Sequence, residues 1–372
     1  MKMNQEIIAR QKRAMAEKGL DGLISISPEN VAYTTGIVVP SQSLMRWRHA
    51  ISVLTSDGRL AMVVIDMEES TVRAHGGVED LRVYREFTED PMDKLCEALT
   101  DLRLERSELG IETEYIPEKD FATLQRKLPH AVFVAADAIF QELRQVKSGE
   151  ELGILRALSK ITDKAICDVL KHARAGMSEM DLAGLLVGGI FAAGAENFKL
   201  MIIASGERSQ FPNVGPSQRA IKKGDIIRME IFGVKSGYHA GVCRTAVVGS
   251  PTPEQEKIWA NLIECKYLVM DLIKPGASCR EVYQKFLKKF SELGFEPISF
   301  VGHGIGLFLH EEPYLGRYAG KTLEEGMVLA IEPLVFIPGR MGLQNKDMIA
   351  VTKSGCELLS DYTPTDRLIR VG

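Results

Sequence analysis

The sequence has no CxxC pair, and its six cysteines are scattered along 372 residues. This spacing excludes a zinc ribbon and argues against a disulfide framework, so we expect reduced thiols and a cytoplasmic protein. No apolar run approaches the roughly 20 residues of a membrane span, and the N-terminus lacks the apolar segment of a secretory signal. The 46 basic and 50 acidic residues form no basic stripe. We therefore expect neither a nucleic-acid nor a membrane partner.

Apolar residues make up 45% of the chain and charged residues 26%, which is typical of a folded globular protein of two domains. In the first part, helix-like and strand-like segments alternate. Residues 7–18 are amphipathic, residues 23–26 are the strand-like run Leu-Ile-Ser-Ile, and "SPENVAYTTGI" is interpreted as a turn and a second strand. Two strands, 50–55 and 60–65, flank the hairpin signal "SDG". This pattern predicts a mixed α/β domain.

A long helix begins after Ser148, which with Glu151 forms a predicted capping box. Its apolar residues recur with helical spacing as far as Leu170. A second helix starts in the same way at Ser178 and Asp181, and further helices are expected near 254–273 and 279–293. We predict two domains, 1–147 and 148–372, and see no internal repeat.

Five segments of the second half carry the strongest signal. In order they are "IIASGERSQFPN", "KKGDIIRMEIFGVKSGYHAGVCRT", "VGHGIGLFLHEEP", "EEGMVLAIEPLVF" and "GLQNKDMIAVT". Together they resemble the creatinase / prolidase / aminopeptidase P / methionine aminopeptidase family, and "GLDGLISISPENVAYTTGI" resembles the start of the creatinase-type N-terminal domain. The resemblance implies an α/β (α+β) fold, with a small α/β domain followed by a pita-bread catalytic domain.

Metal-dependent members of that family hold two divalent ions with five side chains. The resemblance places these ligands at Glu230, Gly241, His303, Glu332 and Lys346. Both bridging carboxylates are therefore missing, and an ammonium stands where one of them would be. A lysine repels an incoming divalent cation, so we expect no metal and no other cofactor.

Creatinase is the nearest mechanistic relative by this reasoning, which predicts a metal-independent C–N hydrolase or lyase. Its substrate would be a small zwitterionic amide, ureido or guanidino compound. We expect His310 to move the proton, because an ordinary histidine titrates near pH 6.5. The predicted catalytic residues are His310, Glu332, Lys346 and Glu230.

Substrate-binding residues follow from the same resemblance. Asn213 stands where creatinase has its acid/base histidine, and Arg317 is a candidate for a substrate carboxylate. A homodimer is expected, with the partner's N-terminal domain completing the site through Arg46 and Arg48. The predicted substrate-binding residues are His303, Asn213, Arg317, Cys243, Arg46 and Arg48.

Two alternatives remain open. A metal-dependent Xaa-Pro peptidase would need Glu230, His303 and Glu332, with His239 or Asp347 completing a new metal site. A non-catalytic pita-bread binding protein is the other alternative, since Asn213 cannot shuttle a proton.

Overall fold

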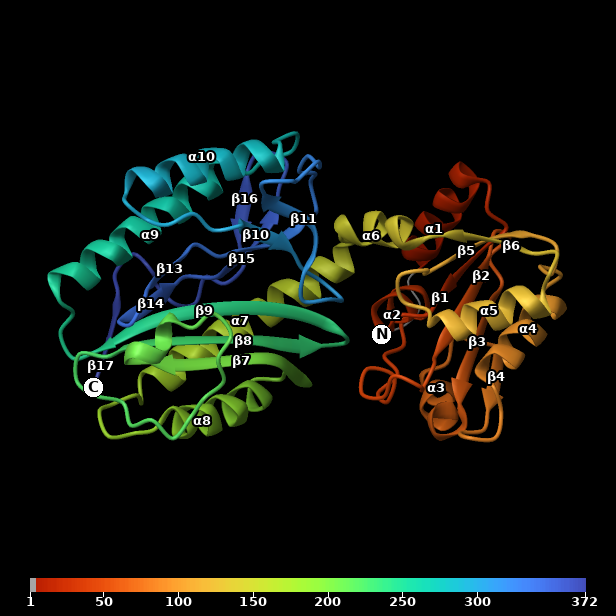
Figure 1. Ribbon diagram of the computed structural model, residues 1–372, viewed down its shortest axis with the longest axis horizontal. Helices are drawn as coiled ribbons and strands as arrows, with labels where there is room; N and C mark the ends of the chain where they lie inside the picture. Colours follow the sequence, from red (N-terminus) through yellow and green to blue (C-terminus); the bar gives the residue numbers. More distant parts are fainter. Residues whose placement is uncertain (1–4) are drawn as a thin grey trace. The chain divides into compact units, whose positions relative to one another are not determined.

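The computed structural model describes residues 5–372, so the first four residues of the expected N-terminal domain lie outside the described range. The chain divides into two compact units, Met1–Arg144 and Gln145–Gly372. Figure 1 shows each unit as a mixture of helices and strands. Within residues 5–372, no helix combines the length and the apolar composition needed to cross a membrane.

The N-terminal unit is built on one six-stranded sheet. The first strand pairs antiparallel with the second and parallel with the fifth, and the outer pairs at both edges are parallel. The predicted hairpin around "SDG" is confirmed, because its two strands pair antiparallel. The strand order across the sheet is β4 (Asp80–Tyr84), β3 (Leu60–Ile65), β2 (Ile51–Thr55), β1 (Gly22–Ser25), β5 (Glu108–Ile111) and β6 (Val132–Ala135).

Helices cover both faces of this sheet. Two helices, α4 (Pro91–Asp101) and α5 (Glu118–Lys127), pack on one face around Val53 and Val63. The opposite face packs against α1, α6, α2 and α3. Their bounds are α1 (Gln5–Lys18), α2 (Pro28–Thr35), α3 (Glu69–His75) and α6 (Asp137–Gln145).

The expectation of a strand within "SPENVAYTTGI" is wrong, because this segment forms α2. Ser27 caps the helix by accepting a hydrogen bond from the backbone N–H of Asn30, and Pro28 begins it. Gly36 ends it in the left-handed conformation that glycine adopts without strain. Both capping signals were present in the sequence and outweighed the β-branched residues between them.

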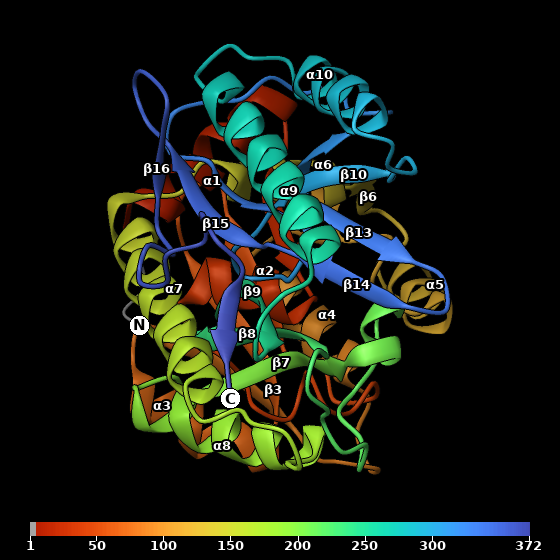
Figure 2. The same ribbon diagram turned by 90° about the vertical axis from the view of Figure 1, so that its left-hand side faces the viewer.

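In the C-terminal unit, two helix pairs enclose the strands (Figures 1 and 2). The pairs are α7 (Gly149–Leu170) with α8 (Glu179–Ala192), and α9 (Pro253–Leu272) with α10 (Cys279–Glu292). The capping boxes predicted at Ser148 and Ser178 are both formed. The core between α9, α10 and the adjacent strands includes Trp259, Phe286 and Phe290, all buried.

The strands form two larger sheets and a hairpin. One sheet has the order β17 (Ile369–Val371), β9 (Tyr238–Val248), β8 (Ile226–Lys235) and β7 (Asn197–Ser205). The other has the order β11 (Glu311–Gly316), β10 (Phe300–Gly304), β12 (Val328–Ile331), β15 (Asp347–Val351) and β16 (Cys356–Leu358). The hairpin is β13 (Leu334–Ile337) with β14 (Met341–Gln344). Cys243 and Lys346 exchange two backbone hydrogen bonds of 3.2 Å, which fix β9 against the start of β15.

The unit contains an internal repeat that the sequence analysis did not predict. Each half has a long helix, a shorter helix and then strands. The shorter helix is capped by Ser178 in one half and by Ser278 in the other. Each cap also forms an isolated β-bridge, to Ala220 and Thr322 respectively. The two halves also share a Gly-x-Ser sequence at this point, Gly176 to Ser178 and Gly276 to Ser278, so a short sequence signal of the repeat was present.

Candidate functional site

Lys346 is buried between two glutamates in the C-terminal unit. Its Nζ lies 3.0 Å from Glu230 Oε1 and 2.9 Å from Glu332 Oε2. Glu230 is on β8, Glu332 directly follows β12, and Lys346 immediately precedes β15. The ammonium also lies 4.4 Å from the centre of the Phe232 ring, in cation–π contact. Three separate strands therefore meet at this one cation.

These ion pairs shift the titration of both partners. Burial lowers the pKa of Lys346, but attraction to Glu230 and Glu332 outweighs it, so the pKa lies above its ordinary value. Burial raises the pKa of Glu332, and repulsion from Glu230 adds to this effect, so the pKa lies above its ordinary value although Lys346 lowers it. Lys346 is consequently an ammonium at neutral pH, and Glu332 is the carboxylate that accepts a proton more readily than usual.

Two histidine rings stack beside these charges. His303 lies on β10 and His310 directly precedes the neighbouring strand β11. Their ring centres are 3.7 Å apart and their planes differ by 8°. Burial, followed by the nearby charge of Lys346, lowers the pKa of His303 well below its ordinary value and that of His310 to about 4. Both imidazoles are therefore neutral at pH 7.

The hydrogen bond made by His303 identifies its tautomer. Nδ1 lies 2.7 Å from the carbonyl oxygen of Gly304, which only accepts, so we assign the ring proton to Nδ1. Nε2 then carries a lone pair. This atom is buried without a hydrogen-bond partner, and Glu332 Oε1 lies 3.5 Å from it.

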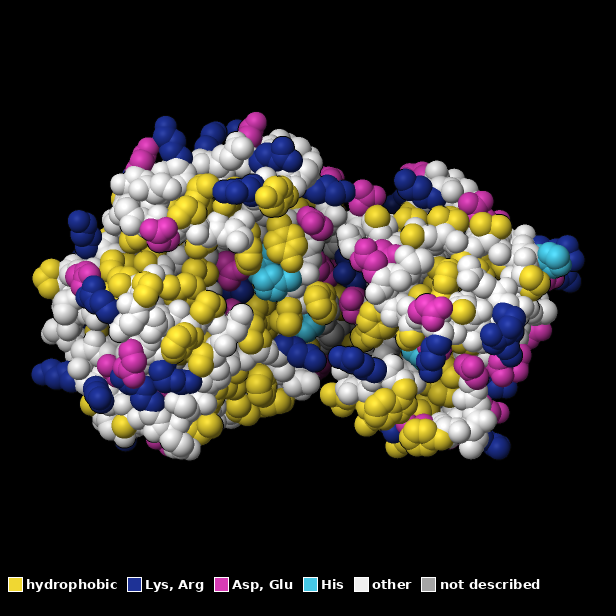
Figure 3. Space-filling view, viewed as in Figure 1, with side chains coloured by type: hydrophobic (Ala, Val, Ile, Leu, Met, Phe, Trp, Pro, Cys, Tyr) yellow, Lys and Arg dark blue, Asp and Glu magenta, His cyan; other side chains and the backbone are white. Residues whose placement is uncertain are grey.

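His303, His310 and Glu332 are the described residues that can hold a metal ion together. Each offers one ligand atom, and the three atoms lie within 4.8 Å of one another. Histidine and acidic side chains lie side by side on the face of the C-terminal unit seen in Figure 3, among hydrophobic side chains. The orphaned Nε2 of His303 fits such an ion.

Gly241 faces Phe232 across the hairpin of β8 and β9. A Cβ atom at position 241 would lie only 2.4 Å from Cε1 of the Phe232 ring. The ring therefore fills the space that a side chain at this position would need. The missing carboxylate at Gly241 and the ammonium at Lys346 are thus linked, since the same ring contacts both.

Of the other predicted site residues, Cys243 lies next to this pocket, because it pairs with Glu230 across β8 and β9 and with Lys346 in a β-bridge. Cys243 is buried, and its Sγ lies 3.8 Å from the carbonyl oxygen of Gln344. Asn213 and Arg317 are exposed. Among residues 5–372, no hydrogen bond or ion pair joins either of them to the glutamates, Lys346 or the histidines.

Arg46 and Arg48 belong to the N-terminal unit. Arg48 forms two hydrogen bonds with Glu86, of 2.8 and 2.9 Å, and Arg46 is exposed. Glu86 also accepts a hydrogen bond from Trp47 Nε1. The guanidinium of Arg48 is therefore paired within its own unit, and a role for either arginine toward a neighbouring chain stays a prediction.

Two residues considered for a rebuilt metal site do not join this pocket. Nδ1 of His239 lies 3.2 Å from the carbonyl oxygen of Gly306. Asp347 forms ion pairs with Arg244 at 2.9 Å and Lys266 at 3.1 Å. Neither residue is among the described side chains whose ligand atoms converge with those of His303 and Glu332.

Sequence reasoning missed Phe232 and Gln344. Gln344 Nε2 donates to Glu332 Oε2 at 3.3 Å, while its Oε1 accepts from Arg228 at 2.8 Å. For Phe232 a signal existed, because a hairpin turning at Ser236 and Gly237 pairs this residue with Gly241. No comparable signal pointed to Gln344.

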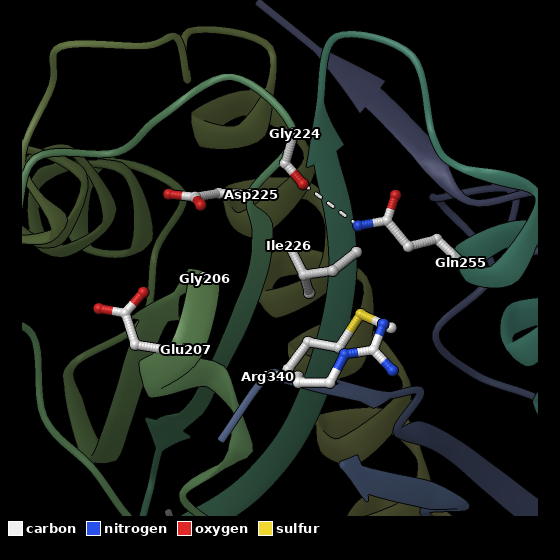
Figure 4. A pocket seen from close by; sticks show the side chains of 8 residues that line it. Gly206, Glu207, Gly224, Asp225, Ile226, Gln255 and Arg340 are labelled. Carbon is white, nitrogen blue, oxygen red and sulfur yellow. Dashed lines mark hydrogen bonds between the residues drawn. The ribbon is translucent and has the colours of Figure 1, made fainter. Parts of the chain in front are cut away.

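A separate hollow of about 250 Å³ opens near the start of β8 (Figure 4). Gln255 donates a hydrogen bond to the carbonyl oxygen of Gly224 across it. Its charged lining residues all form ion pairs: Glu207 and Asp225 with Arg219, and Arg340 with Glu254. None of the predicted site residues lines this hollow.

Comparisons with known proteins place this geometry in a family context. The model of the metallopeptidase family M24 matches residues 153–353, and that of the creatinase/prolidase N-terminal domain matches residues 8–146. An Xaa-Pro dipeptidase of Pyrococcus horikoshii is 31% identical over 279 residues, covering 74% of this chain and 77% of the relative. An Xaa-Pro dipeptidase of Pyrococcus furiosus is 27% identical over 370 residues, covering 98% of this chain and 99% of the relative.

The solved structure of a prolidase from Thermococcus sibiricus has a TM-score of 0.87 and 25% identity, and the match covers 100% of each chain. The resemblance and the pita-bread fold expected from the motifs are therefore confirmed. The expectation of a metal-independent, creatinase-like hydrolase of ureido or guanidino compounds is wrong. The matched family is a metallopeptidase family, and the relatives are Xaa-Pro dipeptidases.

The five positions that the resemblance assigns to two metal ions do not fit a pair of ions in this chain. One position is Gly241, which has no donor atom and whose side-chain space is filled by Phe232. Another is Lys346, whose ammonium is bound to the two remaining glutamates. Three ligand-capable residues are left, too few to surround two ions.

Proposed function

Because the chain belongs to the metallopeptidase family M24, we propose that it is a peptidase that hydrolyses short peptides at the bond preceding proline. The observation that carries the proposal is the convergence of His303, His310 and Glu332 within 4.8 Å. Similarity to Xaa-Pro dipeptidases over 98% of the chain supports the substrate class.

The surroundings of His310 suit a prolyl side chain. The Phe300 ring stands nearly perpendicular to the His310 ring, with centres 6.0 Å apart, and Tyr314 lies 6.2 Å from it. All three side chains are half-buried. They form an apolar wall with one polar ring in it, which matches a pyrrolidine ring next to a peptide carbonyl.

The side chains supply binding and proton transfer. His310 is neutral at pH 7, so one ring nitrogen carries a proton that it can donate in a hydrogen bond to the peptide carbonyl, and the other carries a lone pair. Glu332, with its raised pKa, is the group that can hold a proton taken from water. A divalent ion bound in this pocket would supply polarisation of the carbonyl and a lower pKa of water.

Assembly and location are parts of the proposal that rest on the sequence. We keep the homodimer as a prediction, with the neighbouring N-terminal domain completing the site through Arg46 or Arg48. The six cysteines are free, which supports a reducing, cytoplasmic location.

The test compares hydrolysis of Ala-Pro and Ala-Ala by protein supplied with Mn²⁺, Co²⁺ or Zn²⁺. We expect at least a tenfold preference for Ala-Pro. His310→Ala is expected to lower kcat/KM by roughly 10²-fold, within the range of a lost general acid–base group. His172→Ala is the matched control, because His172 is an exposed histidine after α7 that contacts the backbone of Asp168.

Equal turnover by wild type, His310→Ala and Glu332→Gln would contradict the assignment. Failure to cleave either dipeptide with any of the three ions would instead favour the non-catalytic alternative. The ion pairs that Lys346 forms with both glutamates support that alternative. Binding of Ala-Pro without turnover, measured by calorimetry, would then identify a peptide-binding protein.

A further inference from the structure

Arg228 is a buried residue of β8, and within residues 5–372 its guanidinium has no carboxylate partner. We propose that Arg228 is a positioning residue of the candidate site. It orients the side-chain amide of Gln344 toward Glu332 and holds the loop that carries Asn213. This role rests on the proposed function, but both contacts are measured without substrate, so the role and the peptidase activity can fail separately.

The guanidinium of Arg228 divides its hydrogen bonds between two segments. Nη1 donates to Gln344 Oε1 at 2.8 Å. Nη2 donates to two consecutive carbonyl oxygens, that of Phe211 and, at 3.0 Å, that of Pro212. The Phe336 ring centre lies 5.3 Å from Cζ, in cation–π contact. One buried side chain therefore joins β14 to the loop that follows β7.

The orientation of the Gln344 amide follows from the first contact. A guanidinium only donates, so the amide oxygen faces Arg228 and the amide nitrogen faces Glu332. Nε2 then donates to Glu332 Oε2 at 3.3 Å. The backbone of Gln344 is held independently, because its N–H donates to Thr245 Oγ1 at 3.1 Å and its carbonyl oxygen accepts from the same hydroxyl at 2.7 Å. Arg228 therefore decides which end of the amide faces the carboxylate, while Thr245 decides where the residue lies.

That orientation determines whether Glu332 meets a donor or an acceptor. With the amide reversed, the Gln344 oxygen would face Oε2, and two acceptors would repel each other in a buried site. Oε2 would then keep Lys346, at 2.9 Å, as its donor. Two donors hold the plane of the carboxylate more firmly than one, and this plane sets the direction of Oε1. Loss of the Gln344 donor is thus expected to turn the carboxylate that the proposed function uses.

The second contact acts on the loop that carries Asn213. Phe211, Pro212 and Asn213 are all exposed, so the loop is not held by burial of these side chains. Asn213, a predicted substrate-binding residue, directly follows the two carbonyls to which Arg228 donates. The same guanidinium therefore restrains a segment on the substrate side and the donor to Glu332.

The chemistry of arginine suits this double contact. Arg228 and Glu230 are two residues apart on β8, so their side chains point to the same face of the sheet. An arginine fork has several donors in fixed directions, whereas a lysine ammonium is a compact point charge. At this position arginine reaches Gln344 and the loop together, and a lysine would serve one of them.

The first test measures both contacts without substrate. The side-chain amide signals of Gln344 are assigned by NMR from their absence in Gln344→Met, and hydrogen exchange followed by mass spectrometry reports on residues 211–215. In Arg228→Met we expect the Gln344 signals to shift and exchange in this segment to become roughly tenfold faster, because local opening no longer breaks two hydrogen bonds. Arg156→Met, which removes an exposed arginine paired with Glu357, is the control and should change neither measurement.

Kinetics with Ala-Pro separate the two contacts. Gln344→Met removes only the donor to Glu332, so we expect kcat to fall roughly tenfold, as for a lost hydrogen bond to a charged group, with KM unchanged. Arg228→Met also releases the loop, so its KM should rise as well. Arg228→Lys restores a donor near Gln344 and should recover kcat more than KM. Arg156→Met should retain both wild-type constants.

Three results would overturn the role of Arg228. Unchanged Gln344 signals and unchanged exchange in folded Arg228→Met would show that neither contact depends on the guanidinium. Wild-type kcat in both Arg228→Met and Gln344→Met would show that the contacts have no effect on the reaction. The same kcat and KM in Arg228→Lys as in Arg228→Met, with equal stability in urea, would mean that no donor is needed at this position.

Two further outcomes have a defined reading. If Arg228→Met does not fold, Arg228→Lys and Gln344→Met carry the comparison, and equal constants in these two and wild type would refute the role. Absence of Ala-Pro turnover by wild type would contradict the proposed function instead. The amide signals and the exchange of residues 211–215 would then still decide whether Arg228 orients Gln344 and holds the loop.

Discussion

Two buried clusters of charge meet at consecutive residues, Lys346 and Asp347, and they differ in how completely their charges are paired. Asp347 forms ion pairs with Arg244 at 2.9 Å and Lys266 at 3.1 Å. Arg244 also binds Asp163 at 2.9 Å. This cluster contains two cations and two anions, so its net formal charge is zero.

The cluster around Lys346 is less completely paired, because the neighbouring Arg228 guanidinium is connected to Glu332 only through Gln344. It has two carboxylates for one ammonium, and beside it the Nε2 atom of His303 has no hydrogen-bond partner. Successive residues of an extended chain point to opposite faces, so one short segment contributes to both clusters. A saturated cluster serves the fold, whereas excess negative charge and a buried acceptor without a donor are typical of a functional site.

The largest loss of unfolding free energy is expected when the ion pairs around Asp347 are broken. Arg244→Met leaves Asp163 and Asp347 facing each other with one cation fewer, and removing one partner of a buried pair costs about 3 to 5 kcal/mol. We expect the free energy of unfolding in urea to fall by that amount. Arg156→Met is the matched control, because the Arg156–Glu357 pair, at 2.7 Å, is 42% exposed at both side chains. A change within about 1 kcal/mol is expected there. Equal losses in both variants would remove the distinction between buried and exposed pairs.

A smaller change in unfolding free energy is expected when Asp347 is protonated at low pH. Burial raises the pKa of this carboxyl, but Arg244 and Lys266 outweigh it and lower the pKa to about 2. The folded-state pKa thus lies below the unfolded value of 3.8. The carboxylate therefore stabilises the fold above about pH 4, and this contribution is lost as the pH falls through 2. Its size is about 2 kcal/mol.

Comparison of wild type with Asp347→Asn tests this directly. The difference in unfolding free energy should be constant between pH 5 and 7 and shrink as the pH falls from 4 toward 2. A difference that does not change over that range would mean that the charge of Asp347 contributes nothing.

Local signals explain which parts of the fold the sequence predicted. The capping boxes at Ser148 and Ser178 and the hairpin of β2 and β3 depend on residues close in the chain, and all are confirmed. The strand expected after Ser27 is wrong, because Pro28 and Gly36 delimit a helix there. The repeat of helix pairs was missed because the sequence signal that the two halves share is short, a Gly-x-Ser before each of the two shorter helices.

The sequence predicted which residues form the site, but not which of their atoms contact one another. Motif order placed Glu230, Glu332 and Lys346 together, and the structure shows them in contact. The metal-free expectation counted only the family's ligand positions. It could not include His310, whose approach to His303 depends on the pairing of β10 with β11. The tautomer of His303 follows from its hydrogen bond to the Gly304 carbonyl oxygen, so the lone pair on Nε2 could not be predicted from the sequence.

The smallest effect is expected at Gly241, beside the incomplete cluster. In Gly241→Ala the new Cβ would meet Phe232 Cε1 at 2.4 Å, which forces the ring away from Lys346. Overpacking of this kind costs roughly 1 to 3 kcal/mol, and partial movement of one ring places the expected loss of unfolding free energy near 1 kcal/mol. Phe232→Leu in the same chain should recover most of that loss, because the shorter side chain leaves room for the methyl group.

Gly153→Ala is the matched control, since Gly153 is exposed within α7 and nothing lies within 4 Å of a Cβ atom there. Alanine favours a helix over glycine by up to about 1 kcal/mol, so this variant should be slightly more stable than wild type. A double-mutant cycle measures the coupling between positions 241 and 232. Additive effects in that cycle would show that Phe232 does not occupy the place of the missing side chain.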